Sequence, residues 1–194
     1  MSLKADLAYL GSIRIYIGLS VFIFALTAVM GYVAAGSNSE LASSMLDELE
    51  MLKWIMDQPP FMIMIIIFLK NSLACAMSVL LGLGLGLLPL LIVVTNGFML
   101  GVVSYNVIQK AGPLYLLAGI LPHGIIELPV VLISIGLGFR LGYLVALSVL
   151  GEKADLVKET KIAVHILLLR LMPLLFLAAS IETFITPQAI SVVA

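Results

Sequence analysis

A histidine and a glutamate stand four residues apart inside a strongly apolar part of the chain. They are His123 and Glu127, in the run Leu-Pro-His-Gly-Ile-Ile-Glu-Leu-Pro over residues 121–129. On a helix this spacing puts both side chains on one face, where they can reach a common point. A carboxylate at membrane depth is costly unless it is paired, protonated or in contact with water. We therefore expect the pair to have a partner or a function.

Four interpretations of this pair are open. The two side chains could be weak candidates for metal ligands, although a site needs at least one more ligand and His165 is expected on the opposite side of the membrane. They could be an acid and a base, but no Gly-x-Ser-x-Gly or His-Glu-x-x-His motif accompanies them. They could carry a proton or an ion, as such pairs do in transporters. The fourth interpretation is structural, a hydrogen-bonded pair that orders a broken helix and its neighbours.

The composition predicts a membrane protein. The chain has 194 residues, of which 62% are hydrophobic and 11% are charged. This charged share is less than half that of an average soluble domain, so too little polar surface exists to cover a soluble core. Helices in a bilayer instead present apolar side chains to lipid. No basic patch suggests nucleic acid, no cofactor or catalytic residue is indicated, and the single cysteine, Cys75, is expected to be a small buried residue.

Five apolar segments are long enough to cross a bilayer. They cover residues 13–35, 61–82, 87–108, 123–150 and 162–185. The glycine-rich turn between the second and third segments carries no charge, and its glycines let backbones approach closely. Pro187 is expected to end the last span. The predicted fold class is therefore all-α, a polytopic membrane helix bundle that forms a single domain over residues 1–194.

Two further segments are expected outside these spans. Residues 36–60 form an external loop, in which residues 41–56 place apolar side chains along one stripe and predict an amphipathic surface helix with Trp54 as its anchor. Residues 111–122 contain an apolar piece that is too short to span, which predicts a re-entrant or interfacial helix that ends at Pro122. The fourth span then begins at His123 or Gly124, with the positive end of its dipole beside the pair.

The basic residues of the short loops predict the orientation. Lys4 and Arg14 flank the start of the first span. Three more lie between the fourth and fifth spans: Lys153, Lys158 and Lys161. The positive-inside rule then puts the N-terminus in the cytoplasm and the C-terminus outside the cell membrane, with Lys110 as the one loop charge on the wrong side.

Several other polar side chains fall at membrane depth. On this topology Lys70, Glu127 and Glu182 can meet in the outer half, where an ammonium group would offset part of the desolvation cost of the carboxylates. Arginines in the inner half are expected to snorkel or to contact lipid headgroups, and the two asparagines to make interhelical hydrogen bonds. The full set of polar-core candidates is Lys70, Asn71, Asn96, His123, Glu127, Arg140, Arg170 and Glu182.

Several of these residues lie in motifs of a known family. The run Asn-Ser-Leu-Ala from Asn71, the run Thr-Asn-Gly-Phe-Met-Leu-Gly over residues 95–101 and the run over residues 121–129 resemble the stage II sporulation protein M family of multi-pass membrane proteins. The resemblance covers about residues 70–150, and more loosely the whole chain. It implies a polar core at Asn71, Asn96, His123 and Glu127. For the named member in spore formers, it implies anchoring of cell-wall hydrolases at the septum during engulfment.

The leading functional hypothesis is a non-enzymatic membrane scaffold or accessory protein with a buried Asn/His/Glu cluster that organises the bundle. Its expected partners are the lipid bilayer and either a second copy or another membrane protein, because Gly97 and Gly101 have the GxxxG spacing that permits helix-mediated dimerisation. The alternative is a small transporter or channel for an ion or a lipid-like solute, with Lys70, His123 and Glu127 along its path. The second alternative is a membrane metalloenzyme.

Overall fold

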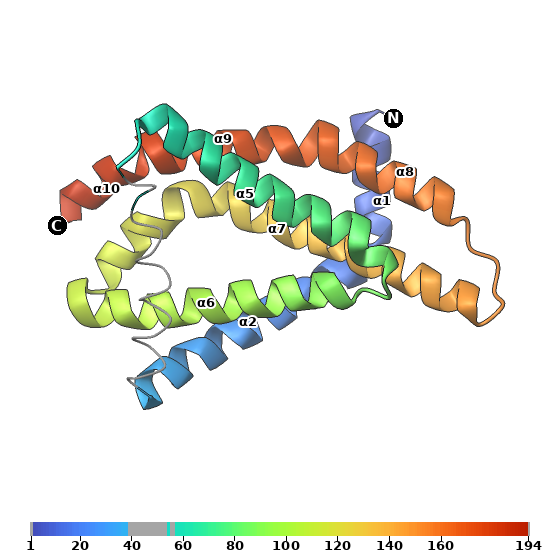
Figure 1. Ribbon diagram of the computed structural model, residues 1–194, viewed down its shortest axis with the longest axis horizontal. Coiled ribbons are helices and arrows are strands. Elements are labelled where there is room, and N and C mark those ends of the chain that lie inside the picture. The colour runs from blue at the N-terminus through green and yellow to red at the C-terminus, as the bar shows by residue number, and fades with distance from the viewer. Residues whose placement is uncertain (1, 39–53, 55–56, 194) are drawn as a thin grey trace.

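The computed structural model describes residues 2–38, 54 and 57–193, and every regular element among them is helical (Figure 1). Within these residues, five helical segments are long and apolar enough to cross a membrane: Arg14–Ser37, Pro60–Leu83, Leu87–Ala111, Pro113–Val149 and Leu156–Val193. The predicted all-α bundle is thus confirmed. The amphipathic helix expected at residues 41–56 lies outside the described residues, apart from Trp54, whose side chain is exposed.

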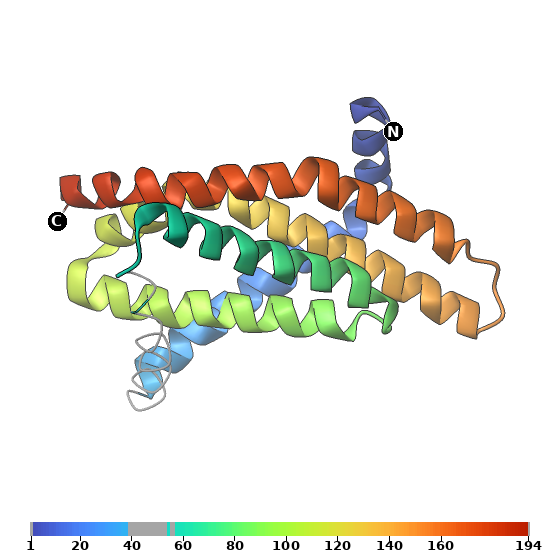
Figure 2. The same ribbon diagram turned by 45° about the horizontal axis from the view of Figure 1, so that its top comes forward.

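A short helix that we did not expect precedes the first span. Helix α1 (Leu3–Ser12) begins at Ser2, whose hydroxyl oxygen accepts a hydrogen bond from the Ala5 N–H at 3.3 Å. This is the usual way in which a serine caps a helix N-terminus. The chain turns at Ile13 before α2 (Arg14–Ser37), so that α1 is steeply inclined to the long helices in both views (Figures 1 and 2). Asp6 on α1 is therefore brought against the bundle and is buried.

The second and third spans are joined by the glycine-rich turn, as predicted. Helix α5 (Pro60–Leu80) continues into a 3-10 turn, η1 (Leu81–Leu83), and α6 (Leu87–Ala111) follows. Gly86 has a φ of 75°, a value that glycine adopts without strain. A Cβ added at Gly82 would lie 2.5 Å from the carbonyl oxygen of Gly138 in helix α7 (Pro113–Val149). The glycines of the turn therefore serve close helix packing.

The prediction of a separate short helix at residues 111–122 is wrong. Helix α7 (Pro113–Val149) is one helix of 37 residues that contains both Pro122 and Pro129. A proline in a helix interior removes one backbone hydrogen bond and bends the helix, but neighbouring helices in a membrane protein allow it to continue. The first part of α7 is accordingly inclined to the remainder (Figure 1). His123 and Glu127 lie inside a bent helix, not at a helix N-terminus.

The fifth span is also longer than predicted. It consists of α8 (Leu156–Ile166), a π-helical turn η2 (Leu167–Leu171), α9 (Met172–Phe184) and α10 (Thr186–Val193), which form one extended run (Figure 2). Pro187 does not end this run, because it lies in the first turn of α10, where its missing N–H costs nothing. In η2 the Met172 N–H donates to the Leu167 carbonyl, the wider bond of a π-turn.

Small residues set the distance between α2 and α6. A Cβ added at Gly101 would overlap the carbonyl oxygen of Ala28, and one at Gly97 would overlap the Thr27 hydroxyl. Both glycines therefore pack against α2 of the same chain and are not available for a dimer interface. Homodimerisation stays a prediction without support from these two residues. Large apolar side chains on the outer faces, such as Phe22, are exposed and suited to lipid contact.

The main core cluster lies between α5, α7 and the last span, and Cys75 is buried in it as expected. Its buried members are Ile13, Cys75, Val79, Val130, Leu137, Leu141, Ala163, Ile166, Leu167, Leu171 and Leu175. The N-terminal helix and the loop of residues 150–155 lie toward one end of the bundle, and the C-terminus lies at the other (Figure 1).

Candidate functional site

Polar side chains from four helices line one cavity, which we call the polar cavity. It has a volume of about 380 Å³. Its polar lining comprises Lys70 and Asn71 on α5, Asn96 on α6, His123 and Glu127 on α7, and Glu182 on α9. Apolar side chains, among them Phe24 of α2, complete the wall. Six of the eight polar-core candidates from the sequence are thus brought together, although they are spread over 113 residues of chain (Lys70 to Glu182, counting both).

Three of these side chains could share one ligand. His123, Glu127 and Glu182 each offer one donor atom, and these three atoms lie within 4.8 Å of one another. The first two come from successive turns of α7, and Glu182 approaches from α9. The sequence analysis sought the third metal ligand at His165, whereas the structure puts Glu182 in that place. Histidine nitrogen with carboxylate oxygens is a donor set that suits first-row divalent cations.

Thr186 lies within hydrogen-bond distance of both the His123 ring and the backbone of α9. Its Oγ1 is 3.3 Å from the Ile181 carbonyl oxygen and 3.3 Å from His123 Nδ1. When the single hydroxyl hydrogen points to Ile181, Thr186 accepts a hydrogen bond from Nδ1–H. The lone pair of the neutral ring is then on Nε2, so this nitrogen is the one able to bind a proton or a cation.

The carboxylates of the polar cavity are not neutralised by Lys70. Among the described residues Lys70 makes no ion pair, and it is exposed. In the same part of the chain, Glu127 Oε2 is buried without a hydrogen-bond partner. Lys70, Glu127 and Glu182 therefore line the same cavity, but the ammonium group of Lys70 forms no ion pair with either glutamate among the described residues. A partly satisfied polar network in a low dielectric is costly unless something fills it.

The two asparagines behave differently from each other. Asn96 Nδ2 donates to the Ile92 carbonyl oxygen at 2.8 Å, within its own helix, and among the described residues it has no hydrogen bond to another helix. A short amide side chain readily bonds the carbonyl four residues back, which explains the difference. Asn71 on α5 lies on the polar cavity and is close enough to Glu127 to interact with its carboxylate.

The two remaining candidates, Arg140 and Arg170, both have carboxylate partners within the protein, which the sequence analysis did not predict. Arg170 Nε donates to Asp6 Oδ2 at 2.8 Å, and Asp6 is only 1% exposed. His165 Nε2 lies 3.6 Å from the other oxygen of Asp6, so His165 belongs to this second cluster. The 12 residues from Arg170 to Glu182 correspond to about 18 Å of helix, which separates the two sites.

Arg140 completes a network beside this second cluster. Its Nε lies 3.7 Å from Glu159 Oε2, and its guanidinium carbon is 5.7 Å from the centre of the Tyr16 ring. Tyr9 of α1 donates a hydrogen bond of 2.7 Å to the same Glu159 oxygen. Burial, and then this hydrogen bond, raise the pKa of the Tyr9 phenol. Asp6, Tyr9 and Glu159 were not among the predicted residues, because nothing local shows that α1 folds onto α8 and η2.

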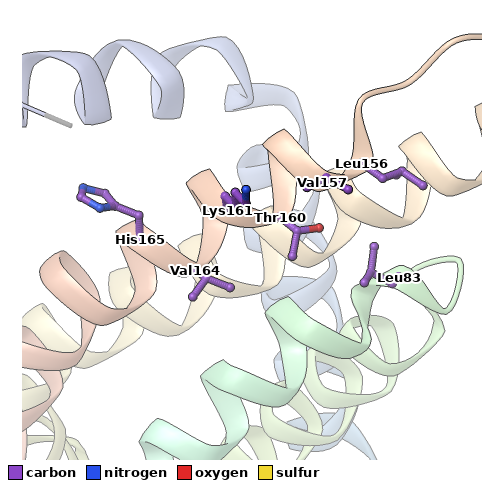
Figure 3. A pocket seen from close by; sticks show the side chains of 7 residues that line it. All are labelled: Leu83, Leu156, Val157, Thr160, Lys161, Val164 and His165. Carbon is purple, nitrogen blue, oxygen red and sulfur yellow. The ribbon is translucent and has the colours of Figure 1, made fainter.

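A groove larger than the polar cavity lies on another part of the bundle, and few of its side chains could bind or react with a polar ligand. It has a volume of about 630 Å³ and is formed by α8 and η1. Figure 3 shows Thr160 and Val164 pointing toward Leu83 across this groove, whereas His165 points away toward α1. The lining is mostly apolar, as expected of a surface that contacts lipid chains. The polar cavity is therefore the stronger candidate for a functional site.

The chain is similar to known proteins over most of its length. The family model described as Stage II sporulation protein M matches residues 20–187. An uncharacterized protein of Methanocaldococcus jannaschii is 30% identical over 178 residues, which cover 90% of this chain and 96% of that relative. No solved structure matches the chain. The family match includes every polar residue that lines the polar cavity.

Proposed function

Because this chain belongs to the stage II sporulation protein M family, we propose that it is a non-enzymatic accessory protein of the membrane whose polar cluster organises the bundle. The observation that carries this proposal is the convergence of six polar side chains from α5, α6, α7 and α9 on one cavity. Lipid offers no hydrophobic drive for helix association, so polar contacts and small residues must specify the arrangement.

Helix α7 is the element that most needs such support. Its first third is bent away from the rest by Pro122 and Pro129, which weaken its own hydrogen bonding. Beyond the bend, Gly138 packs against the Ser78 carbonyl of α5 and Pro89 of α6. Before and at the bend, His123 contacts Thr186 of α10. The polar cluster thus holds the bent part, while the glycines hold the straight part.

A matched pair of threonine variants tests this role. Thr186 bonds His123 of another helix, whereas Thr183 Oγ1 donates only to the Ala179 carbonyl of its own helix, at 2.9 Å. In nanodiscs, Thr186→Val should speed amide hydrogen exchange in α10 and in the first part of α7. Thr183→Val should leave exchange unchanged. Equal exchange in the two variants would contradict an organising role.

A second candidate function is favoured by the cavity itself. A cluster that served packing alone would fill its own space, but Lys70, His123 and Glu127 surround about 380 Å³. Ionisable groups around a cavity at membrane depth are typical of ion and solute pathways. This candidate is a small transporter or channel for an ion or a lipid-like solute. Flux into liposomes that is lost in Glu127→Gln would support it, and wild-type protein without flux would remove it.

We propose an orientation on the basis of the distribution of basic residues. Helix α1 and the loop of residues 150–155 lie toward the same end of the bundle (Figure 1). Lys4 and Lys153 belong to these two segments, so the positive-inside rule puts this end in the cytoplasm and the C-terminus outside. We expect a single domain, with a second copy or another membrane protein as partner. Labelling of single cysteines at residues 4 and 192 from either side of sealed vesicles tests the orientation.

A further inference from the structure

We propose that the polar cavity is a binding site for one divalent transition-metal cation, of the Zn²⁺ or Mn²⁺ class, held by His123, Glu127 and Glu182. The cation would join α7 to the last span, because two of the ligands lie on α7 and the third on α9. This inference deepens the organising role proposed above, and it rests on that proposal only for the location of the polar cluster. It adds that the ligand of the polar cavity is a divalent cation.

The first argument is geometric. The three donor atoms already lie within 4.8 Å of one another. Around a tetrahedral cation with bonds of about 2.1 Å, donor atoms are about 3.4 Å apart. The ligands must therefore approach by up to about 1.4 Å, which rotations of the two glutamate side chains can supply. Carboxylates without a cation between them repel each other, so a wider spacing is the expected starting state.

The second argument is the state of the His123 ring. Thr186 Oγ1 lies 3.3 Å from Nδ1, and in the tautomer whose Nδ1–H donates to Thr186 the Nε2 lone pair is free to bind a cation. Metal-binding histidines almost always donate their other ring N–H in this way, which fixes tautomer and orientation. Thr186 is thus a positioning residue for the ligand nitrogen.

The third argument is charge. Glu127 Oε2 is buried, and it has no hydrogen-bond partner in the described part of the chain. The other groups that face it are the neutral amides of Asn71 and Asn96 and the ammonium group of Lys70. Lys70 is exposed and makes no ion pair among the described residues. A divalent cation balances the charges of the two carboxylates, which the neutral amides cannot do, and it gives the unpaired oxygen a ligand bond.

Lys70 then acts as a competitor of the cation. Its side chain lines the polar cavity without an ion pair among the described residues, so its positive charge repels a cation that binds there. Removal of its charge should therefore strengthen cation binding. If Lys70 were instead a necessary ion-pair partner of the glutamates, its removal would weaken the site.

Titration of the purified full-length protein in nanodiscs tests the proposal. Metal-free wild-type protein should bind one Zn²⁺ or Co²⁺ per chain, as measured by calorimetry and by the absorption spectrum of Co²⁺. Glu127→Gln and Glu182→Gln should bind at least tenfold more weakly, and Lys70→Met should bind more tightly. Two controls should bind as wild type: Glu152→Gln, which removes an exposed loop carboxylate, and Cys75→Ser, which removes the thiol.

A further variant keeps the test valid if the glutamine variants fold poorly. Glu182→His retains a ligand atom, so it should keep binding and change the Co²⁺ spectrum. The proposal is wrong if the wild type binds neither metal, or if Glu127→Gln and Glu182→Gln bind as the wild type does. If no metal binds but amide exchange is faster in Thr186→Val, the cation site is wrong and the organising role stands. If metal binds but exchange is unchanged in Thr186→Val, the organising role is wrong and the cation site stands.

Discussion

Arg170 and Asp6 form a hydrogen-bonded ion pair of 2.8 Å across 164 residues of sequence. Asp6 is 1% exposed, so water cannot solvate its charge and the guanidinium group must do so. The pair fastens α1, a helix outside the spans, to the π-turn η2 of the last span. Together with the 2.7 Å hydrogen bond from Tyr9 to Glu159, it holds the N-terminal helix against the bundle.

Loss of this pair should destabilise the protein. Arg170→Gln leaves the Asp6 charge buried, and hydrogen bonds to charged groups contribute roughly 1.5–3 kcal/mol. We expect a decrease of that size in the free energy of unfolding, measured by denaturant titration in detergent. Arg14→Gln is the control, because Arg14 is an exposed arginine near the same end of the chain. If the two variants are equally stable, the pair does not hold α1.

The glycines between α2 and α6 should tolerate no side chain. Gly101→Ala would push a methyl group into the Ala28 carbonyl and separate the helices, which should cost about 1–3 kcal/mol. Gly18→Ala on α2 is the matched control, because a Cβ there meets no described atom within 4 Å. This control should be neutral, or should stabilise the helix by up to about 1 kcal/mol. Thermal unfolding in detergent measures both, and a Gly101→Ala protein as stable as Gly18→Ala would refute close packing.

Stability should fall at alkaline pH through Tyr9. The pKa of Tyr9 is raised by burial and then by its hydrogen bond to Glu159, so its contribution is complete below the unfolded pKa of about 10. The contribution is lost as the pH rises toward the folded pKa, because the unfolded chain releases the proton first. Wild type should thus be more stable than Tyr9→Phe at pH 8, and this advantage should shrink by about pH 11. An advantage that is constant with pH would argue against the Tyr9–Glu159 contact.

Chelation should lower the stability of the wild type selectively. A cation that binds only the folded protein raises its stability in proportion to the logarithm of cation concentration over the dissociation constant. The melting temperature of wild type in detergent should fall on addition of EDTA and recover with excess Zn²⁺. Glu182→Gln should melt at one temperature under all three conditions. An equal response of both proteins would locate the cation away from the polar cavity.

The sequence predicts the spans well, because runs of about 20 apolar residues have one physical explanation in a bilayer. It also predicts that Lys70, Glu127 and Glu182 lie at similar depth on three spans, and all three line the polar cavity, although Lys70 makes no ion pair with the glutamates among the described residues. It does not predict that α7 is continuous. A proline is a helix boundary in most sequences, and only tertiary packing lets Pro122 stay inside a helix.

The partners of Arg140 and Arg170 could not be predicted from local pattern. Arginine near a membrane surface has two ways to solvate its charge, lipid headgroups or a protein carboxylate, and hydropathy does not separate them. The choice depends on α1, whose direction is set by the turn at Ile13. The role of Thr186 was not predicted either. Pro187 was expected to end the last span, whereas the chain continues past it as α10, whose first residue is Thr186.

The link between α7 and the last span is tested most directly by a distance measurement between two spin labels. Leu114 at the start of α7 and Val192 in α10 are both exposed and can carry labels in a Cys75→Ser background. In nanodiscs the wild-type cluster should give one narrow distance distribution, and His123→Ala should broaden it. Asn106→Ala should not, because within the described part of the chain the Asn106 amide donates to Val102 of its own helix and to no other helix. A distribution for His123→Ala as narrow as that of Asn106→Ala would contradict an organising role for the polar cluster.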